Sequence, residues 1–459
     1  MGGISVIRAG RLIDGTGAEP QRDVTLTVEG GTIVRVEPGG RRPHDAAVLA
    51  LSDYTVNMHA HTVLPGDGTA LERWMELPDE FLLQASANAR AALWSGVTTI
   101  RDCGGKGQLM FRLREAIRAG IVAGPRFVLS GRPLTITGGY CRHFGGEVDG
   151  PEGMRRATRQ LLREGADFIK LMAAGGGTVG TYPQYPAFDL DELRVAIGEA
   201  HKIGKPASCH CIATTSIELA LEAGTDHIEH CFFMAPDTTW QFDGRLARRL
   251  AAAGVYVTAT LQVMINSMAA MRARHARGLA TPQESRTVET EPHRNDATIA
   301  NIRLLHGLGV PLVAGSDAGW RYTGFDDFLE ELIYLAQAGL SPLEAIHAAT
   351  GREAETCRLA GAVGTVAPGC VADMIAVAGD PLADLAALKT PAVVVQGGAL
   401  LVDRRCHASW RIVRGGAAGV RASGAASRPT GITSATTRAG SACSRLAGSA
   451  RFSRSPTAA

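Results

Sequence analysis

The pattern of hydrophobic and polar positions divides the chain into three parts that differ in period. In the first, about residues 1–53, apolar residues alternate with polar or small ones at 24–28 and 33–36. The run Glu29-Gly30-Gly31-Thr32 separates these two segments. Alternation with a period of two predicts strands, and a glycine pair between them predicts the turn of a β-hairpin.

The middle part, 54–364, alternates short apolar runs with longer amphipathic segments. Eight strands are predicted, at 54–59, 97–102, 126–130, 167–172, 206–210, 225–230, 255–260 and 311–317. Helices are predicted between them, most clearly at 81–95, 153–165, 190–203 and 242–253, and glycines follow or end many of these segments, as is typical of helix C-termini. Eight strand–helix units predict an α/β fold, a (β/α)8 TIM-like barrel. A doubly wound sheet is the alternative, but Gly175-Gly176-Gly177 alone is too weak a signal for its phosphate-binding loop.

The third part, 365–404, returns to strands at 371–377 and 392–402, the latter broken by Gly397-Gly398. We expect the first and third parts to pair into one small β-sandwich domain beside the barrel, so that the two chain ends meet. The remainder, 405–459, is rich in Ala, Gly, Ser, Thr and Arg and contains no Asp or Glu. Such a segment cannot bury enough apolar surface to fold alone, and we expect a disordered tail. A basic nucleic-acid-binding arm is the alternative.

Composition narrows the classes of partner. The 459 residues are 45% hydrophobic and 20% charged, which is typical of a globular protein, and the net charge of +2 gives no reason to expect nucleic acid or an anionic membrane. No apolar run approaches the ~20 residues that span a bilayer, and the N-terminus lacks the apolar core of a secretory signal. Nine scattered cysteines without a C-x-x-C pair indicate reduced thiols. We therefore expect a cytoplasmic homo-oligomer that acts on a small molecule.

Two candidate sites for chemistry lie on the first and fourth predicted strands. His59-Ala60-His61 ends the first strand, and residues two apart on a strand point to the same face, so both imidazoles can approach one metal ion. Lys170 lies among apolar residues in the fourth strand. A buried lysine is costly unless its charge is neutralised or used. The alternative is a lysine whose amine reaches the surface.

Three more candidates end later strands: His210 the fifth, His230 the sixth and Asp317 the eighth. His227 lies three residues before His230, and we expect only His230 of this pair to point inward. Metal-binding residue types thus occur at the C-terminal ends of five predicted strands, the face where such barrels place their active sites. Imidazole and carboxylate suit zinc, manganese, iron or cobalt, and the lack of a thiolate cluster argues against a structural zinc.

With these residues, the chain resembles the amidohydrolase superfamily over about residues 5–404, in its two-metal branch with a carbamylated lysine. The opening 10–17 and the closing 364–369 with 372–374 are similar to that superfamily's composite β domain. The stretches 165–170 and Ile228-Glu229-His230 resemble the subgroup that contains metal-dependent prolidases, Arg/Lys carboxypeptidases and ochratoxin-type amidases.

The resemblance implies a binuclear metal site. It implies that His59 and His61 hold one metal with Asp317, that His210 and His230 hold the other, and that Lys170, carbamylated by carbon dioxide, bridges them. Zinc is expected, with manganese, iron or cobalt as alternatives. It also implies hydrolysis of an amide or peptide-like C–N bond, in a dipeptide or an N-acyl amino acid, by a metal-bridging hydroxide whose proton Asp317 transfers.

The loop after the third strand supplies a further candidate. His143 lies in the glycine-rich segment 138–146, and such loops over a barrel mouth often bind substrate. We predict that His143 or Arg142 contacts the substrate's carbonyl or carboxylate; a solvent-facing loop residue is the alternative. The segment 175–185 is a second predicted specificity loop.

Two features depart from the family pattern. The family usually leads into its first histidine pair with Pro-Gly, two apolar residues and Asp, whereas here the lead is 53–57 and ends in Asn57. A second histidine often follows the strand-five ligand, and here that position is Ile212. The alternatives on the same site are a cyclic amide, lactone or carbamate hydrolase, and a catalytically inactive binding protein.

Overall fold

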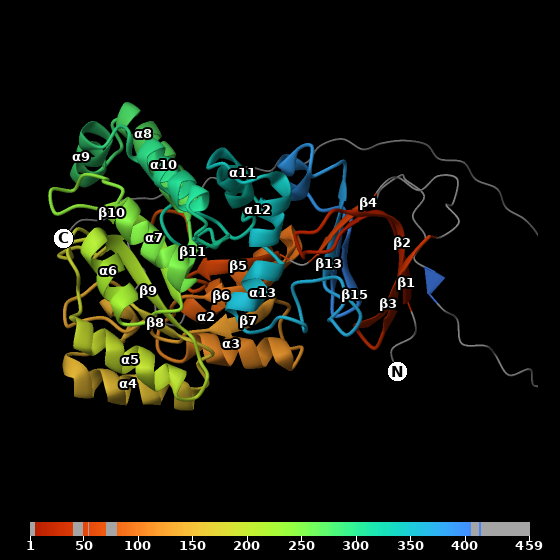
Figure 1. Cartoon of the computed structure of the whole chain (residues 1–459), viewed down its shortest axis with the longest axis horizontal. Coiled ribbons are helices and arrows are strands. Elements are labelled where there is room, and N and C mark those ends of the chain that lie inside the picture. The colour runs from red at the N-terminus through yellow and green to blue at the C-terminus, as the bar shows by residue number, and fades with distance from the viewer. Residues whose placement is uncertain (1–4, 40–48, 54, 70–79, 405–412, 415–459) are drawn as a thin grey trace, which may run out of the picture. The chain divides into compact units, whose positions relative to one another are not determined.

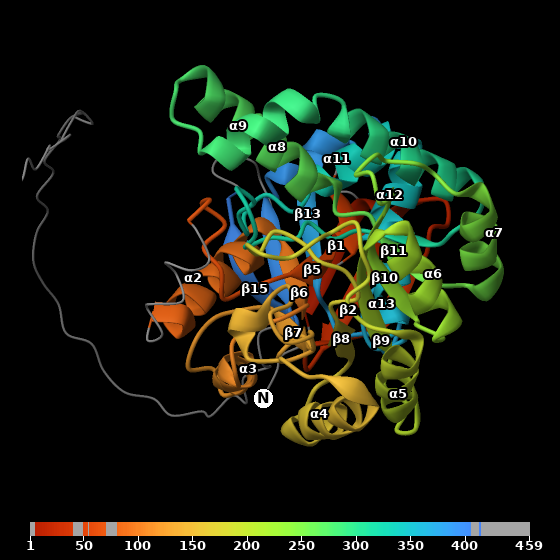
Figure 2. The same ribbon diagram turned by 90° about the vertical axis from the view of Figure 1, so that its left-hand side faces the viewer.

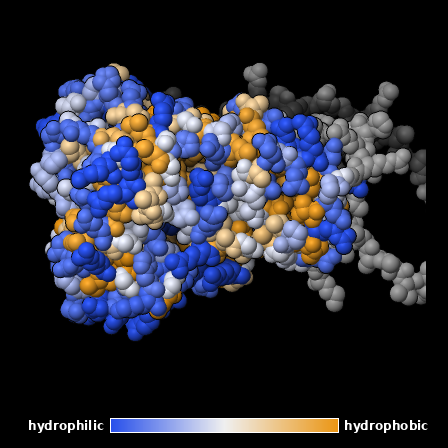
Figure 3. Space-filling view, viewed as in Figure 1, coloured by the Kyte–Doolittle hydropathy of each residue, from blue (hydrophilic) through white to orange (hydrophobic). Residues whose placement is uncertain are grey.

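The computed structural model describes residues 5–39, 49–53, 55–69, 80–404 and 413–414, all of which fall within one compact unit. Most of the segment predicted as a tail, 405–459, lies outside the described residues. Along the described part of the chain, no helix combines the length and the apolar character that crossing a membrane requires. On the face shown in Figure 3, hydrophobic residues form separate patches among hydrophilic ones.

Eight parallel strands form the centre of the middle part (Figure 1). A three-stranded sheet has the order β5-β6-β7, and a five-stranded sheet has the order β12-β11-β10-β9-β8. Their bounds are β5 Thr55–Ala60, β6 Val97–Asp102, β7 Arg126–Leu129, β8 Ile169–Leu171, β9 Ala207–Ala213, β10 His227–Met234, β11 Tyr256–Thr258 and β12 Leu312–Val313. All eight overlap predicted strands, since short apolar runs bounded by turn residues are a strong local signal, although β9 and β10 extend three and four residues beyond their predicted ends.

Helices follow each of these strands and surround them in the view of Figure 2. The predicted helices are present as α2, α4, α5 and α7. The helices of the described residues are α2 Glu80–Ser95, α3 Leu109–Arg118, α4 Gly150–Glu164, α5 Leu190–His201, α6 Thr214–Glu222, α7 Gly244–Ala253, α8 Leu261–Ala276, α9 Pro282–Thr290, α10 Arg294–Gly307, α11 Glu330–Gln337, α12 Pro342–Ala348 and α13 Gly351–Thr356. The pair α8 and α9 is additional to a simple strand–helix repeat, and α8 packs against both α9 and α10.

Strands from both ends of the described chain pair in one sheet of the order β15-β14-β13-β4-β1-β2-β3, with β16 beside β1. Their bounds are β1 Ser5–Ile13, β2 Gln21–Glu29, β3 Thr32–Pro38, β4 Leu49–Asp53, β13 Met374–Ala378, β14 Val393–Gln396, β15 Ala399–Asp403 and β16 Val413–Arg414. The predicted hairpin is confirmed as β2–β3. Its turn residue Gly31 has φ +87°, and a Cβ there would lie 2.6 Å from the carbonyl oxygen of Gly397, so only glycine fits this close approach.

Two hydrophobic clusters account for most of the buried apolar residues. The larger lies between the parallel strands and their helices and includes Ile100, Leu129 and Ile228. The smaller belongs to the sheet of the chain ends and joins Leu26 of β2 to Met374 of β13. Segments more than 300 residues apart along the chain therefore share one core, which holds the ends of the described chain against each other.

Candidate metal centre

The six residues predicted as metal ligands lie within the parallel strands or just beyond their C-terminal ends, and His210 and His230 precede the ends of β9 and β10 by three and four residues. His59, Lys170, His210 and His230 belong to β5, β8, β9 and β10, while His61 and Asp317 follow β5 and β12. All six side chains are buried: none belongs to a residue more than 5% exposed. Polar groups at this depth need partners, and the pairs they form define the site.

His59, His61 and Asp317 form one donor group. The Nε2 atoms of both histidines lie 3.5 Å from the same oxygen, Oδ1 of Asp317, and the three atoms are within 4.8 Å of one another. This Oδ1 has no hydrogen-bond partner among the described residues although it is buried. Two imidazole nitrogens and a carboxylate oxygen turned toward one point suit a divalent cation.

His210 and His230 form a second group beside the first. Their ring centroids are 4.5 Å apart, and the His230 centroid lies 5.0 Å from that of His59. His230 Nδ1 lies 2.7 Å from the hydroxyl of Thr260, and His210 Nε2 lies 3.1 Å from the carbonyl oxygen of Gly175. Each histidine can donate an N–H to these oxygens, which leaves its other ring nitrogen with a lone pair for a metal.

Lys170 is fully buried, so the alternative of a lysine that reaches the surface is wrong. Its Nζ has no hydrogen-bond partner in the part of the chain that the structure describes, and Oε1 of Glu229 lies 3.8 Å from it. An ammonium group left in this state is costly. The partnerless Nζ and the partnerless Oδ1 of Asp317 thus both fit a site that takes up a further group.

Burial determines the charge of the imidazoles. It lowers the pKa of His210 to about 3, with the charge of Lys170 adding to the effect. It lowers the pKa of His61 to about 4, against a hydrogen bond to Gly104 that raises it. Burial raises the pKa of Asp317 to about 7, although Lys170 opposes this shift. The imidazoles are therefore neutral at neutral pH, the form that binds metals.

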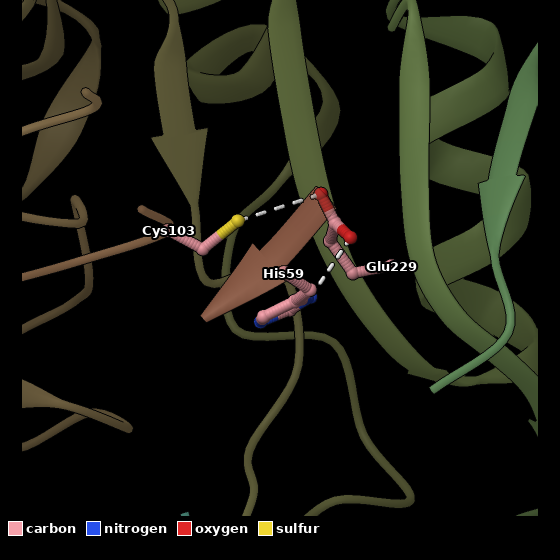
Figure 4. Close-up of side chains that lie close together, drawn as sticks. All are labelled: His59, Cys103 and Glu229. Carbon is pink, nitrogen blue, oxygen red and sulfur yellow. Dashed lines mark hydrogen bonds and ion pairs between the residues drawn. The ribbon is translucent and has the colours of Figure 1, made fainter. Parts of the chain in front are cut away.

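Glu229 connects the candidate metal site to buried polar residues of other strands, and the sequence analysis gave it no role. Its carboxylate lies 2.8 Å from His59 Nδ1 and 2.6 Å from Arg101 Nη1, and it accepts a hydrogen bond from Ser208 Oγ at 2.5 Å. Figure 4 shows His59 and Cys103 turned toward it. The signal available in the sequence was a carboxylate within an otherwise buried strand, two residues from His227 and next to His230.

His59, Cys103 and Glu229 also lie close enough together to suggest a metal site. Burial raises the pKa of the Cys103 thiol, so it stays protonated, and its Sγ lies 3.6 Å from the carbonyl oxygen of Met58. The Glu229 carboxylate is already paired with Arg101. We interpret this group as one that orients His59, because an N–H donated from Nδ1 to Glu229 leaves Nε2 turned toward Asp317.

The backbone of β10 explains an error in the sequence prediction. His227 and His230 are both buried, and His227 Nε2 lies 3.9 Å from Glu229 Oε2, so the expectation that only one of the pair points inward is wrong. His230 has φ +73°, and the pairing register of β10 shifts after it. Such an irregularity turns a side chain out of strict alternation, and it is found next to active sites.

Asn57, the departure from the family's strand-one pattern, joins the two halves of the first donor group. Its Nδ2 donates to Ser316 Oγ at 2.6 Å, and its Oδ1 accepts from the backbone N–H groups of Ser316 at 3.1 Å and His59 at 3.3 Å. A carboxylate would lack the donor. The amide thus ties the strand of His59 to the turn that carries Asp317.

His143 lies in a short 3-10 helix, η1 Arg142–Phe144, and is half-buried. The ring of the next residue, Phe144, is stacked on His61 with the centroids 6.0 Å apart. This places the η1 segment next to the first donor group. Contact of His143 with a substrate stays a prediction.

Glu331 holds the backbone next to Thr260, the residue that contacts His230. Its buried carboxylate accepts hydrogen bonds from the backbone N–H groups of Leu261 at 3.0 Å and Gln262 at 2.6 Å, at the start of α8. The residue before them, Thr260, has φ +47° and holds His230. Burial raises the pKa of Glu331 to about 8, against these two hydrogen bonds.

This pKa predicts how stability depends on pH. An unfolded glutamate has a pKa of about 4.3. Between that value and about 8, the carboxyl is protonated in the folded state and ionised in the unfolded state, so the free energy of unfolding falls as pH rises. We expect the melting temperature of the wild type to fall relative to that of Glu331→Gln as pH rises from 5 to 8, measured by scanning calorimetry. Parallel curves for the two proteins would contradict this account.

The donor set and the parallel strands together define a class of protein. A family model, the amidohydrolase family, matches residues 55–400, and the chain belongs to this family. It is therefore an enzyme, a hydrolase of amide or peptide-like bonds.

Particular relatives agree with this assignment. The chain is 26% identical to ochratoxinase of Aspergillus niger over an alignment of 453 positions, which covers 86% of this chain and 86% of that sequence. It is similar to a solved structure of a Xaa-Pro dipeptidase with bound methionine in the active site, with a TM-score of 0.76, 25% identity and coverage of 87% of this chain and 100% of that chain. The crystal structure of the A. niger ochratoxinase has a TM-score of 0.72 at 24% identity over 88% of this chain and 96% of that chain, which shows the fold.

Proposed function

We propose that this chain is a binuclear metal-dependent amidohydrolase that cleaves the C–N bond of dipeptides or N-acyl amino acids. The observation that carries the proposal is the approach of two imidazole nitrogens to Oδ1 of Asp317, a buried oxygen with no hydrogen-bond partner among the described residues. The similarity to ochratoxinase and to a Xaa-Pro dipeptidase supports the substrate class.

The residues divide into two metal-binding groups with a bridge. His59, His61 and Asp317 would hold one divalent metal, and His210 and His230 the other. Lys170 would bridge them as a carbamate, which turns its partnerless amine into a carboxylate ligand. Zinc is our first expectation, with manganese, iron or cobalt as alternatives. When bound, the metals supply Lewis acidity that polarises the scissile carbonyl and lowers the pKa of water.

Asp317 is the proposed proton carrier. Its Oδ1 is turned into the site and is free to accept the proton of the attacking water and to deliver it to the leaving nitrogen. The water's hydroxyl is added to the acyl carbon, the C–N bond breaks, and the amine leaves with the proton. Glu229 and Thr260 keep His59 and His230 in the required orientation.

The two parallel sheets fit one (β/α)8 barrel. The backbone N–H of Met58 donates to the carbonyl oxygen of Ala314 at 3.2 Å, and that of Asp317 donates to the carbonyl oxygen of His59 at 2.8 Å. These bonds connect β5 with the segment after β12. The backbone N–H of Leu134 donates to the carbonyl oxygen of Lys170 at 2.9 Å, which connects the segment after β7 with β8. We also propose that the sheet of the chain ends packs on itself as a small β-sandwich around its own hydrophobic cluster.

A cytoplasmic location and a homo-oligomeric state stay predictions from the sequence.

The first test of the metal site is Lys170→Ala. We expect close to two metal ions per chain in the wild type purified without added metal, and a sharp decrease in the variant together with loss of activity, because the bridging group is absent. Inductively coupled plasma mass spectrometry measures the metal content. The control is Lys202→Ala, because Lys202 is an exposed lysine directly after α5. Wild-type protein that stays metal-free after incubation with zinc or manganese and bicarbonate would refute the proposed function.

A further inference from the structure

A cavity of about 330 Å³ adjoins the metal centre, and His210, His230 and Asp317 form part of its wall. Much of the remaining wall is apolar and comes from the end of β10, the segment after it and α8, as Phe232, Trp240 and Met264. A volume of this size is within the range of cavities that enclose small organic ligands. The apolar wall favours a substrate with a large apolar or aromatic side chain.

The same cavity is also lined by two arginines and one glutamate. Arg294, the first residue of α10, and Arg321 both line it, and Glu291 is the carboxylate that faces them. Burial lowers the pKa of Arg294, and Arg321 adds to this effect while Glu291 opposes it. The largely buried guanidinium of Arg294 therefore has one carboxylate, Glu291, and two further guanidinium groups, Arg321 and Arg272, near it.

The hydrogen-bonding capacity of Arg294 is not used up within the protein. Its side chain is only 9% exposed, and its Nη1 lies 3.9 Å from Glu291 Oε2, too far for a hydrogen bond. Its Nε is buried and has no hydrogen-bond partner among the residues that the structure describes. Arg321 makes one long contact, from Nη2 to the carbonyl oxygen of Gly177 at 3.4 Å. Buried donors in this state are satisfied when an anion binds.

We propose that Arg294, assisted by Arg321, binds the carboxylate of the substrate, so that the enzyme selects N-acyl amino acids or dipeptides with a free carboxylate and a large apolar side chain. This inference rests on the proposed function. A planar guanidinium fits a carboxylate with two parallel hydrogen bonds, and the adjacent apolar wall accommodates the side chain next to that carboxylate. Arg294 is then a specificity-determining residue supplied by α10, which packs against α8, a helix that also lines the cavity.

The kinetic test compares N-acetyl-L-phenylalanine with its C-terminal amide, with release of acetate as the readout. We expect the wild type to prefer the free acid. In Arg294→Met the KM for the free acid should rise about 10- to 100-fold, the value of hydrogen bonds to a charged group, while the KM for the amide stays unchanged. Arg294→Lys should retain part of the preference for the free acid, since lysine keeps the positive charge but cannot form the bidentate hydrogen bonds.

The control on the same helix is Arg303→Met, because the Arg303 side chain donates to Gln337 on the outside of the molecule. If Arg294→Met does not fold, Arg321→Met replaces it, since Arg321 is exposed, and a smaller loss of preference for the acid is expected. A wild type that hydrolyses acid and amide equally well, or an Arg294→Met variant that keeps the full preference, would overturn the inference while the proposed function stands.

A binding measurement separates this inference from catalysis. 3-Phenylpropanoate and 3-phenyl-1-propanol share the aromatic tail, lack a C–N bond and differ in the carboxylate. Isothermal titration calorimetry should show tighter binding of the acid to the wild type, and the difference should disappear in Arg294→Met. Failure of the wild type to hydrolyse any amide, with this difference intact, would reject the proposed function and keep the anion subsite. If the difference in affinity between acid and alcohol persists in Arg294→Met, other groups bind the carboxylate, and the inference is refuted.

Discussion

Replacing Asp317 with asparagine is expected to lower kcat by about 10²–10⁴-fold, the usual contribution of a positioned proton-transfer group. The amide has nearly the same size, and its oxygen can take the place of Oδ1 between the Nε2 atoms of His59 and His61. It cannot accept a proton from water and return it to a leaving amine. We therefore expect metal content near that of the wild type and almost no turnover.

Both quantities have to be measured on the same preparation, metal by mass spectrometry and kcat from initial rates. Asp326→Asn is the matched control, because Asp326 is exposed and follows the same strand end. An Asp317→Asn enzyme that keeps its metal and more than about a tenth of wild-type kcat would remove Asp317 from the proton-transfer role.

The second large effect is expected for Glu229→Gln, and it concerns stability as well as activity. The Glu229 carboxylate is fully buried and meets the Arg101 guanidinium, which is itself almost entirely buried. Loss of the negative charge leaves Arg101 without its ion-pair partner in the interior. Breaking a buried pair in this way costs about 3–5 kcal/mol. We expect the melting temperature to fall by roughly 5–10 °C and the metal affinity to decrease, because the partner that orients His59 is altered.

Scanning calorimetry and metal titration test this pair of effects. Glu218→Gln is the control, since Glu218 pairs with Arg249 at 2.7 Å on the surface, where such a pair contributes only about 0–1 kcal/mol. Equal melting temperatures for Glu229→Gln and Glu218→Gln would show that the buried pair does not hold the centre of the site together.

The strands and the predicted metal ligands could be read from the sequence because their signals are local. Val97–Asp102 is a short run rich in β-branched residues that follows Gly96, and the structure has a strand with these bounds. His59 and His61 are two residues apart, and the ends of parallel strands meet by topology. Residue types that bind metals, placed at strand ends, were therefore enough to predict the neighbours of Asp317.

The contacts that orient these ligands could not be read in the same way. Glu229 pairs with Arg101 across 128 residues and with Ser208 across 21. In the sequence they lie in three separate strands, and nothing local links one to another. The left-handed backbone of His230 is likewise imposed by the surrounding packing, since no glycine marks the position and a local propensity would not predict it.

The sequence by itself determined the order of strands and helices, the candidate ligands and the pairing of the chain ends, because periodicity and residue type act over a few neighbouring residues. Only the tertiary structure decided which polar side chains lost contact with water. Arg294 belongs to a polar stretch, 282–296, that has the composition of a solvated surface. In the structure α10 packs against α8, and that arginine is almost fully buried in the wall of the cavity. A charge buried there needs a partner, which we propose is the carboxylate of the substrate.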